Sequence, residues 1–157
     1  MTTDSFICGA LEGFYGRPWL QDQRLQLFQW LKDWEGMNTY MYAPKDDLYH
    51  RSHWREIYPD NILNELKELI QACHKKELKF IYSIAPGLDI TYSSEDEWSL
   101  LIDKIEQIQQ IGCMHFAILF DDIPSKLSKK DEPVYSSFAE AQAVITNRLF
   151  EYFSDSK

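Results

Sequence analysis

The hydrophobic pattern of this chain changes from strand-like to helix-like spacing four times, and this alternation limits the folds open to it. Strand-like runs are expected at residues 6–13, 37–44, 78–86 and 114–120. Each run is followed by a segment with helical spacing, at residues 21–34, 60–76, 94–112 and 137–153. Such alternation is typical of a parallel sheet covered by helices, with right-handed crossovers. The sequence therefore predicts an α/β fold.

Local signals mark where several of these helices begin or end. Asp60 stands at the start of the most regular helical pattern and is a candidate N-cap. Ser94 and Glu97 form the S-x-x-E pattern of a capping box before the third helix. Gly36 and Gly112 follow the first and third helices, where glycine commonly ends a helix.

The connections between the expected elements differ greatly in length. Links from a helix to the next strand are very short, whereas links from a strand to the next helix are long. These long loops cover residues 14–20, 45–59, 87–93 and 121–136. They all leave the carboxyl ends of the strands, where α/β barrels and open α/β sheets place their sites. We therefore expect the functional residues on these loops.

Polar and ionisable residues follow each expected strand. They are Gly13, Tyr15, Gly16 and Arg17 after the first, Lys45, Asp46 and Asp47 after the second, Gly87 and Asp89 after the third, and Asp121 and Asp122 after the fourth. Their convergence indicates a concave site with a polar rim. Simpler roles remain open: glycines serve turns, Asp47 and Asp89 brace loops through backbone N–H groups, and Lys45 is either solvated or held by acidic neighbours.

The adjacent carboxylates Asp121 and Asp122 end the apolar run FAILF. Because a chain turns at a strand end, two consecutive side chains there can reach different atoms of one ligand. Repulsion between two close carboxylates is expected to raise one pKa, so that one holds a proton while the other stays anionic. The same pair is also able to hold Mg²⁺, although that alternative leaves the stretches EGFYGRPW and YAPKDD unexplained.

Composition removes several classes of partner. The chain has 157 residues, the size of one domain, and a net charge of −9. Its only short basic stretch is SKLSKK at 125–130, so nucleic acid is not an expected partner. No membrane is expected either, because no apolar run approaches the roughly 20 residues of a spanning helix. The N-terminal stretch does not resemble a signal peptide, and three widely spaced cysteines fit a reducing compartment.

Four stretches then carry a resemblance to a known family. EGFYGRPW, NTYMYAPKDDLYHRSHWRE, PGLDI and FAILFDDI occur in this order. Together they resemble the catalytic domain of glycoside hydrolase family 84, and most of all its animal members from the nucleus and cytoplasm. The resemblance runs from about Phe6 to Tyr152 and implies a TIM (β/α)₈ barrel. Residues 1–157 would be the N-terminal half of that domain. Since a whole barrel takes about 250 residues, four βα units predict a truncated form with an incomplete barrel.

The resemblance also implies a role for each matching residue. Asp121 resembles the residue that binds the N–H of the sugar's 2-acetamido group, and Asp122 resembles the general acid/base. Gly13 and Lys45 resemble residues that bind sugar hydroxyls, and Tyr15 resembles an aromatic residue lining the acetamido pocket. The implied reaction is retaining hydrolysis of β-linked N-acetylglucosamine from Ser or Thr of proteins. The acetamido oxygen is the nucleophile and forms an oxazoline-type intermediate, a known exception to nucleophilic carboxylates.

No cofactor and no metal is implied by this resemblance. The expected partners are O-GlcNAc-modified proteins in the cytoplasm and nucleus, with a homodimer of edge-paired half-barrels as a further option. Two other functions stay open. One is a catalytically silent half-barrel that only binds partners. The other is a hyaluronidase-like β-N-acetylglucosaminidase, because bacterial members of the family share the same motifs.

Overall fold

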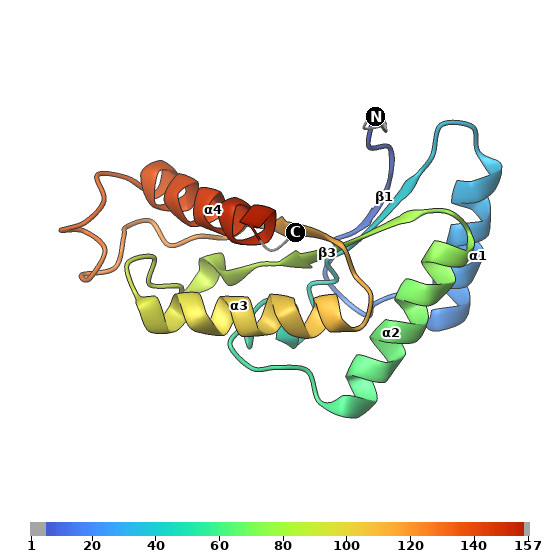
Figure 1. Cartoon of the computed structure of the whole chain (residues 1–157), viewed down its shortest axis with the longest axis horizontal. Coiled ribbons are helices and arrows are strands. Elements are labelled where there is room, and N and C mark those ends of the chain that lie inside the picture. The colour runs from blue at the N-terminus through green and yellow to red at the C-terminus, as the bar shows by residue number, and fades with distance from the viewer. Residues whose placement is uncertain (1–5, 156–157) are drawn as a thin grey trace.

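The computed structural model describes residues 6–155, in which strands and helices alternate along the chain (Figure 1). The strands are β1 (Gly9–Glu12), β2 (Thr39–Tyr42), β3 (Lys79–Ile84) and β4 (His115–Ile118). The helices are α1 (Gln21–Asp33), α2 (Asp60–Lys75), α3 (Glu95–Gln110) and α4 (Phe138–Asp155). Short 3₁₀ turns, η1 (Leu48–His50) and η2 (Pro86–Leu88), lie in the second and third loops. The predicted α/β alternation is confirmed, although every strand is shorter than expected.

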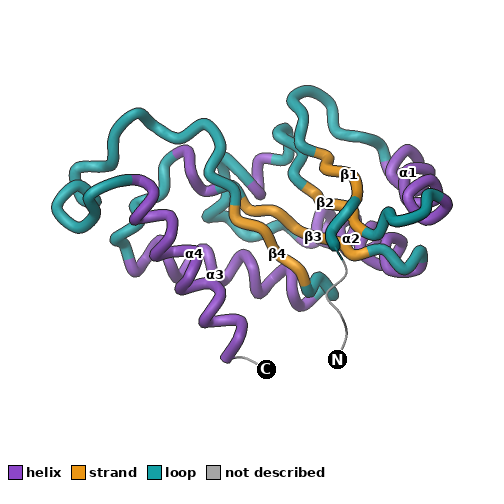
Figure 2. Tube along the Cα trace, turned by 90° about the horizontal axis from the view of Figure 1, so that it is seen from above, coloured by secondary structure: helices purple, strands orange, loops and turns teal. Residues whose placement is uncertain are grey.

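The four strands form one open parallel sheet in the order β1-β2-β3-β4. Each strand pairs with the next one along the chain, so Glu12, Tyr42, Tyr82 and Phe116 lie in one row across the sheet. Figure 2 shows the strands side by side, with long loops gathered along one end of the sheet. The first and last strands of the described sheet each pair on one side only, as four βα units predict.

The hydrophobic core lies between the sheet and its helices. Tyr40, Phe80 and Tyr82 are fully buried, and the rings of Tyr40 and Phe80 lie 5.6 Å apart. From the helices, the buried apolar residues include Phe28, Leu31, Leu66, Leu69, Ile70, Cys73, Leu101, Ile105 and Ile108. Burying one large apolar side chain stabilises a fold by about 1.5–3 kcal/mol, so these stripes fix how the helices lie on the sheet.

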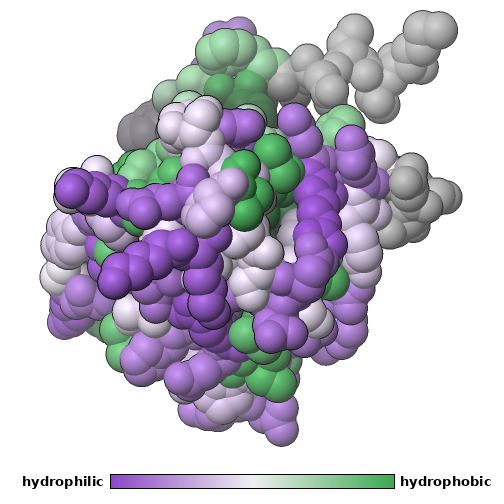
Figure 3. Space-filling view, turned by 90° about the vertical axis from the view of Figure 1, so that its left-hand side faces the viewer, coloured by the Kyte–Doolittle hydropathy of each residue, from purple (hydrophilic) through white to green (hydrophobic). Residues whose placement is uncertain are grey.

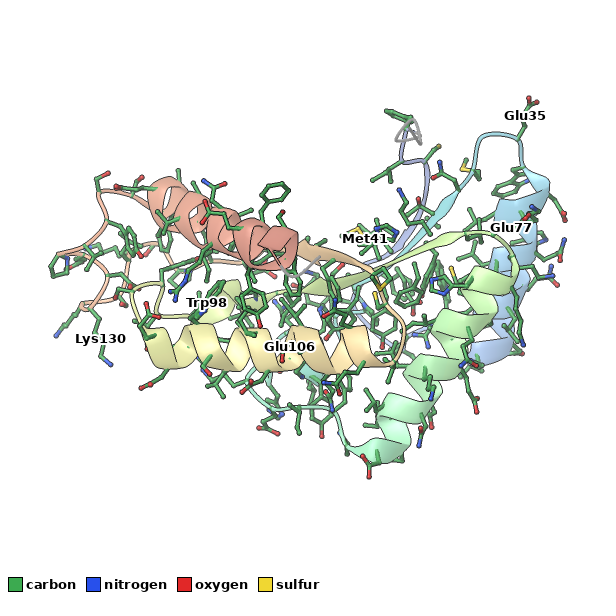
Figure 4. All side chains as sticks on the ribbon, viewed as in Figure 1. Glu35, Met41, Glu77, Trp98, Glu106 and Lys130 are labelled. Carbon is green, nitrogen blue, oxygen red and sulfur yellow. The ribbon has the colours of Figure 1, made fainter. Side chains whose placement is uncertain are left out.

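The opposite face of the sheet is less completely covered. Side chains alternate along a strand, so Leu11, Met41, Ile81 and Ala117 point away from the helices. Leu11 is exposed and Met41 and Ala117 are half-buried, whereas Ile81 in the centre of the sheet is buried. Figure 4 labels Met41 in the middle of the sheet. This face is the one that the interior of a closed barrel would cover.

The predicted helix ends are partly confirmed. Ser94 caps α3 by accepting a hydrogen bond from the backbone N–H of Glu97, at 3.4 Å. The Glu97 side chain does not complete a capping box, because it binds Arg55 instead, at 2.6 Å. The prediction that Asp60 is an N-cap was wrong, because Pro59 occupies that position and Asp60 is the first helical residue. The negative charge of Asp60 still stabilises the helix through its interaction with the N-terminal end of the helix dipole. Gly112 has a φ of 103° directly after α3, which only glycine adopts without strain.

A groove of about 580 Å³ runs between β4 and α4. Its lining is mainly apolar and includes Ile81, Phe116, Leu149, Phe150 and Phe153. No helix within residues 6–155 is both long and apolar enough to cross a membrane.

Candidate active site

The loops at the carboxyl ends of the strands meet at one end of the molecule. Figure 3 shows this end, which is mostly hydrophilic with apolar side chains between the polar ones. Backbone hydrogen bonds tie neighbouring loops together: Lys45 N–H donates to the Phe14 carbonyl at 3.2 Å, and Ala85 N–H donates to the His50 carbonyl at 2.8 Å. The loops are therefore held in register with the sheet below them.

Lys45 and Asp121 form an ion pair across this end of the sheet. The Lys45 ammonium lies 2.5 Å from Asp121 Oδ2, although β3 separates the strands that carry the two residues. The Lys45 side chain is only 9% exposed, whereas that of Asp121 is 50% exposed. Of the two options for Lys45, the amine held by an acidic group is therefore confirmed, and the partner is Asp121.

Asp122 has two partners from two other loops. The Tyr15 hydroxyl donates to Asp122 Oδ2 at 2.6 Å, and Arg51 Nη2 donates to the same oxygen at 2.7 Å. The Arg51 guanidinium also lies 5.7 Å from the centre of the Tyr15 ring. Asp122 itself has a φ of 53°, a left-handed conformation that is uncommon outside glycine and places its carboxylate beside these two groups.

These contacts change two pKa values at the site. The hydrogen bond from Tyr15, followed by the contacts with Arg51 and Lys45, lowers the pKa of Asp122 even though burial acts in the opposite direction. The same hydrogen bond to Asp122 raises the pKa of the Tyr15 hydroxyl. Repulsion within the carboxylate pair was expected to raise one pKa. For Asp122 this was wrong, because hydrogen bonds from a hydroxyl and a guanidinium lower its pKa and outweigh the effect of burial.

His50 supports the second loop from below. It is fully buried, and its Nε2 donates to the carbonyl of Pro44 at 2.8 Å. Because Pro44 precedes Lys45 and Arg51 follows His50, this bond fixes the loop between the two cations. Burial lowers the pKa of His50, which favours the neutral ring.

Asp47 has the structural role that the sequence left open, whereas Asp89 braces its loop through the side chains of Trp54 and Arg55 rather than through backbone N–H groups. Asp47 caps η1 through the Tyr49 N–H at 2.9 Å and accepts a further hydrogen bond from the Tyr58 hydroxyl. Asp89 accepts a hydrogen bond from the Trp54 indole at 3.0 Å. Both carboxylates are therefore used to brace loops, unlike Asp121 and Asp122.

Of the two glycines considered, Gly87 lies close to the segment with the carboxylates, and Gly13 lies at the end of β1. Gly87 packs against the segment before Asp121, since a Cβ added to Gly87 would lie 3.1 Å from the Phe120 Cα. Gly13 directly follows β1, and a Cβ there would meet the side chain of Leu11 at 3.1 Å. The structure thus brings Tyr15, Lys45, Asp121 and Asp122 into contact as two pairs, with Gly13 two residues from Tyr15.

The site does not have the features of a metal centre. Within the described part of the chain, no group of three or more His, Cys, Asp and Glu side chains is placed to hold a metal ion. Asp121 and Asp122 are each bound to a cationic side chain. A magnesium ion would have to displace both cations, so the Mg²⁺ alternative has no support in this geometry.

The fold and the site define a class of protein: an α/β domain with two carboxylates at the rim of its sheet, as in glycoside hydrolases. A family model for β-N-acetylglucosaminidase matches residues 8–157. The chain therefore belongs to the β-N-acetylglucosaminidase family, in agreement with the resemblance to glycoside hydrolase family 84.

Individual relatives agree with this family. The protein O-GlcNAcases of Rattus norvegicus and Mus musculus are each 51% identical to the chain over 150 residues. A solved structure of a mutant O-GlcNAc hydrolase from Thermobaculum terrenum matches with a TM-score of 0.90 and 39% identity. These matches cover 96% of this chain, but only 16% of each mammalian relative and 33% of the bacterial structure. The predicted fold, the first four βα units of a larger barrel, is confirmed.

Arg51 and His50 are site residues that sequence reasoning missed. Both lie in the stretch DLYHRSHW of the second long loop, 45–59, but neither of them was assigned a role in the site from the sequence. The available signal was an arginine in a functional loop, six residues after Lys45, but Arg55 in the same loop offers the same signal. Its partner, Asp122, is 71 positions away and is identified only by the fold.

Proposed function

We propose that the protein containing this chain removes β-linked N-acetylglucosamine from Ser and Thr residues of proteins, by retaining hydrolysis in which the substrate supplies the nucleophile. The observation that carries this proposal is the paired arrangement at the end of β4. Asp121 and Asp122 are adjacent, half-exposed carboxylates, and each is held by a different set of donors. Two neighbouring carboxylates in distinct surroundings are suited to two different tasks.

In this proposal Asp121 orients the 2-acetamido group. Its carboxylate accepts the N–H of that group, which turns the acetamido oxygen toward the anomeric carbon. The ion pair with Lys45 limits the positions that the carboxylate can adopt, and the buried Lys45 ammonium also lies where a sugar hydroxyl can bind it. Holding the reacting groups in this way lowers the barrier without the protein forming a covalent bond.

Asp122 transfers the proton in both halves of the reaction. As an acid it protonates the Ser or Thr oxygen while the acetamido oxygen forms its bond to the anomeric carbon, giving an oxazoline-type intermediate. As a carboxylate it then takes a proton from the water that opens this intermediate. The proton that Asp122 loses in the first step is regained in the second, so the residue ends each turnover unchanged.

The remaining assignments are part of the same proposal. Tyr15 lines the acetamido pocket beside Asp122, and Gly13 offers its backbone to the sugar hydroxyls. Residues 1–157 form the N-terminal half of the catalytic domain, and O-GlcNAc-modified proteins are the partners. A cytoplasmic and nuclear location is supported by the free thiols of Cys8, Cys73 and Cys113, since such thiols are typical of reducing compartments.

Hydrolysis of a chromogenic β-N-acetylglucosaminide tests the activity. The wild-type protein at its full natural length should release the chromophore, and Asp121→Asn and Asp122→Asn should each lower kcat/KM by about 10²-fold or more. Absence of turnover by a folded wild-type protein would refute the proposed function. The isolated 157-residue chain, measured in parallel, shows how much of the activity these four βα units carry alone.

Substrate assistance has its own test. Successive fluorine atoms on the N-acetyl group make its oxygen a weaker nucleophile without changing the leaving group. We therefore expect kcat/KM to fall steeply from the acetyl to the trifluoroacetyl substrate. An unchanged rate across this series would contradict the acetamido oxygen as nucleophile.

A further inference from the structure

Arg51 occupies a special place beside the proposed acid/base. Its side chain is 16% exposed, whereas the Asp122 side chain is 52% exposed, so the guanidinium lies beneath the carboxylate rather than in front of it. Arg51 Nη2 lies 2.7 Å from Asp122 Oδ2 and 3.5 Å from the Tyr15 hydroxyl. One arginine thus contacts both partners of a hydrogen-bonded pair.

Both of these donors contact the same carboxylate oxygen. The Tyr15 hydroxyl and Arg51 each donate to Oδ2 of Asp122. Two directional hydrogen bonds to one oxygen fix the rotation of the carboxyl group and therefore fix where Oδ1 points. Because the arginine lies on the buried side, Oδ1 is the oxygen offered to a ligand on the exposed side.

We propose that Arg51 is a positioning residue for the acid/base carboxylate: with Tyr15 it holds Oδ2 of Asp122, leaves Oδ1 to face the substrate, and favours the anionic form that accepts a proton from water. This inference rests on the function proposed above. It extends that function to Arg51, a residue to which the resemblance assigned no role. Arg51 itself need not touch the sugar or the reacting atoms.

The charges around Asp122 support this role. The groups that act on it are Tyr15 from the first loop and Lys45 and Arg51 from the second, and Asp121 directly precedes it in the chain. The Tyr15 hydrogen bond, then Arg51 and Lys45, lower the pKa of Asp122. The resting site therefore favours the base of the second half-reaction over the acid of the first. Arg51 contributes to this balance beside Tyr15, since its removal takes away a positive charge in contact with the carboxylate.

The pH profile of the full-length protein tests this inference. The first half-reaction requires protonated Asp122, so kcat/KM for a poorly activated substrate falls as pH rises through its pKa. Without Arg51 this pKa rises, and Arg51→Met should move the alkaline limb of kcat/KM upward by about one pH unit. Arg51→Lys keeps the charge and should restore most of the wild-type profile.

A second readout separates the two half-reactions. With a highly activated leaving group the first step needs little acid help, so Arg51→Met should change kcat/KM by no more than about twofold. The second step then limits turnover. In this step Asp122 is the base and is no longer oriented by Arg51, so kcat should fall by about tenfold. A purely structural role for Arg51 would lower both constants together.

Arg148→Met is the matched control. Arg148 also forms an ion pair, with Glu95 at 2.6 Å, but it lies on α4 and stacks on Trp98, away from Asp122. This variant should leave the pH profile unchanged. Thermal melting of each variant verifies folding, and Arg51→Gln replaces Arg51→Met if the methionine variant does not fold.

The outcomes are distinct. A folded Arg51 variant with the wild-type pH profile and kcat refutes the positioning role, and so does an equal shift in Arg148→Met. A wild-type protein without turnover refutes the proposed function instead. Turnover that is lost in Asp122→Asn but unchanged in Arg51→Met overturns only the inference about Arg51.

Discussion

Gly87 lies where the third loop touches the segment that carries the two carboxylates. A Cβ in Gly87→Ala would lie 3.1 Å from the Phe120 Cα and 3.1 Å from the Ile123 Cγ2. Because the first of these is a backbone atom, the segment with Asp121 must shift by a few tenths of an ångström. We expect kcat/KM to fall by about tenfold, since small misplacements of catalytic groups slow turnover strongly. The free energy of unfolding should fall by only about 1 kcal/mol.

Gly36→Ala is the control for this prediction. Gly36 has a φ of 85° and follows α1 at the opposite end of the sheet, with open space around its Cα. Alanine there is strained and should destabilise the fold by about 1 kcal/mol while leaving kcat/KM unchanged. Equal losses of kcat/KM in the two variants would show that Gly87 has no special relation to the site.

His50 predicts how stability depends on pH. Burial lowers the pKa of His50 in the folded chain, whereas an unfolded histidine titrates near about 6.5. Below that value the unfolded chain binds one proton more than the folded chain, so the free energy of unfolding decreases as pH falls. The slope approaches about 1.4 kcal/mol per pH unit for one proton. Urea unfolding between neutral and mildly acidic pH measures it.

Replacing the ring identifies the source of this slope. His50→Gln should be less stable at neutral pH and should show a weaker dependence on pH below about 6.5. His74→Gln, at an exposed position of α2, should keep the wild-type slope. The same slope in the wild-type and His50→Gln proteins would contradict this assignment.

At the scale of elements, the loop between β4 and α4 is fixed by one buried carboxylate. Asp131 accepts hydrogen bonds from the Ser93 N–H at 2.8 Å, the Tyr92 N–H at 3.2 Å and the Ser128 hydroxyl at 2.8 Å. It thereby joins the fourth loop to the third. Asp131→Ala leaves these donors unsatisfied and should lower the free energy of unfolding by about 1–3 kcal/mol. Urea titration measures this change, and Glu132→Ala, at an exposed neighbour, should remain within about 0.5 kcal/mol of wild type.

The helices were predictable from sequence because their signals are local. Apolar stripes at helical spacing placed α3 and α4 to within two residues at each end. The start of α2 was displaced by one position, since Pro59 fits the extended N-cap conformation and left Asp60 inside the helix. Glu97 departed from the capping box because Arg55, brought close by another loop, binds it more strongly than a backbone N–H.

The candidate site was only partly predictable, because some of its signals are local and others depend on contacts between distant loops. Strand ends are read directly from the sequence, and this located Asp121, Asp122, Lys45 and Tyr15 on one rim. Which cation meets which carboxylate depends on how the second loop crosses β3, and no local pattern encodes that crossing. The position of Arg51 beneath Asp122, and the lowered pKa that follows, therefore required the folded structure.

At the scale of the whole molecule, the sheet edge and the β4–α4 groove expose apolar surface. Met114 and Phe150 line this groove and are both exposed, and β4 pairs only with β3 within the described sheet. Open strand edges beside apolar surface promote association. We expect the isolated 157-residue chain to self-associate as its concentration rises, as measured by sedimentation velocity.

Phe150→Glu should weaken this association without lowering the melting temperature by more than a few degrees, because the ring is exposed rather than part of the core. Ile57→Glu introduces the same charge at an exposed position in the second loop and should leave the association unchanged. A chain that stays monomeric at high concentration would show that the β4–α4 groove does not promote self-association.

The strand order β1-β2-β3-β4 also has a consequence for the timing of folding. Each strand pairs with its predecessor, so the sheet can grow stepwise as the ribosome delivers the chain, without waiting for distant segments. The two carboxylates come last: their partners lie 76, 71 and 107 positions earlier in the chain. A nascent chain that stops before β4 therefore contains Tyr15, Lys45 and Arg51 but neither carboxylate, so these contacts form only after β4 has been synthesised.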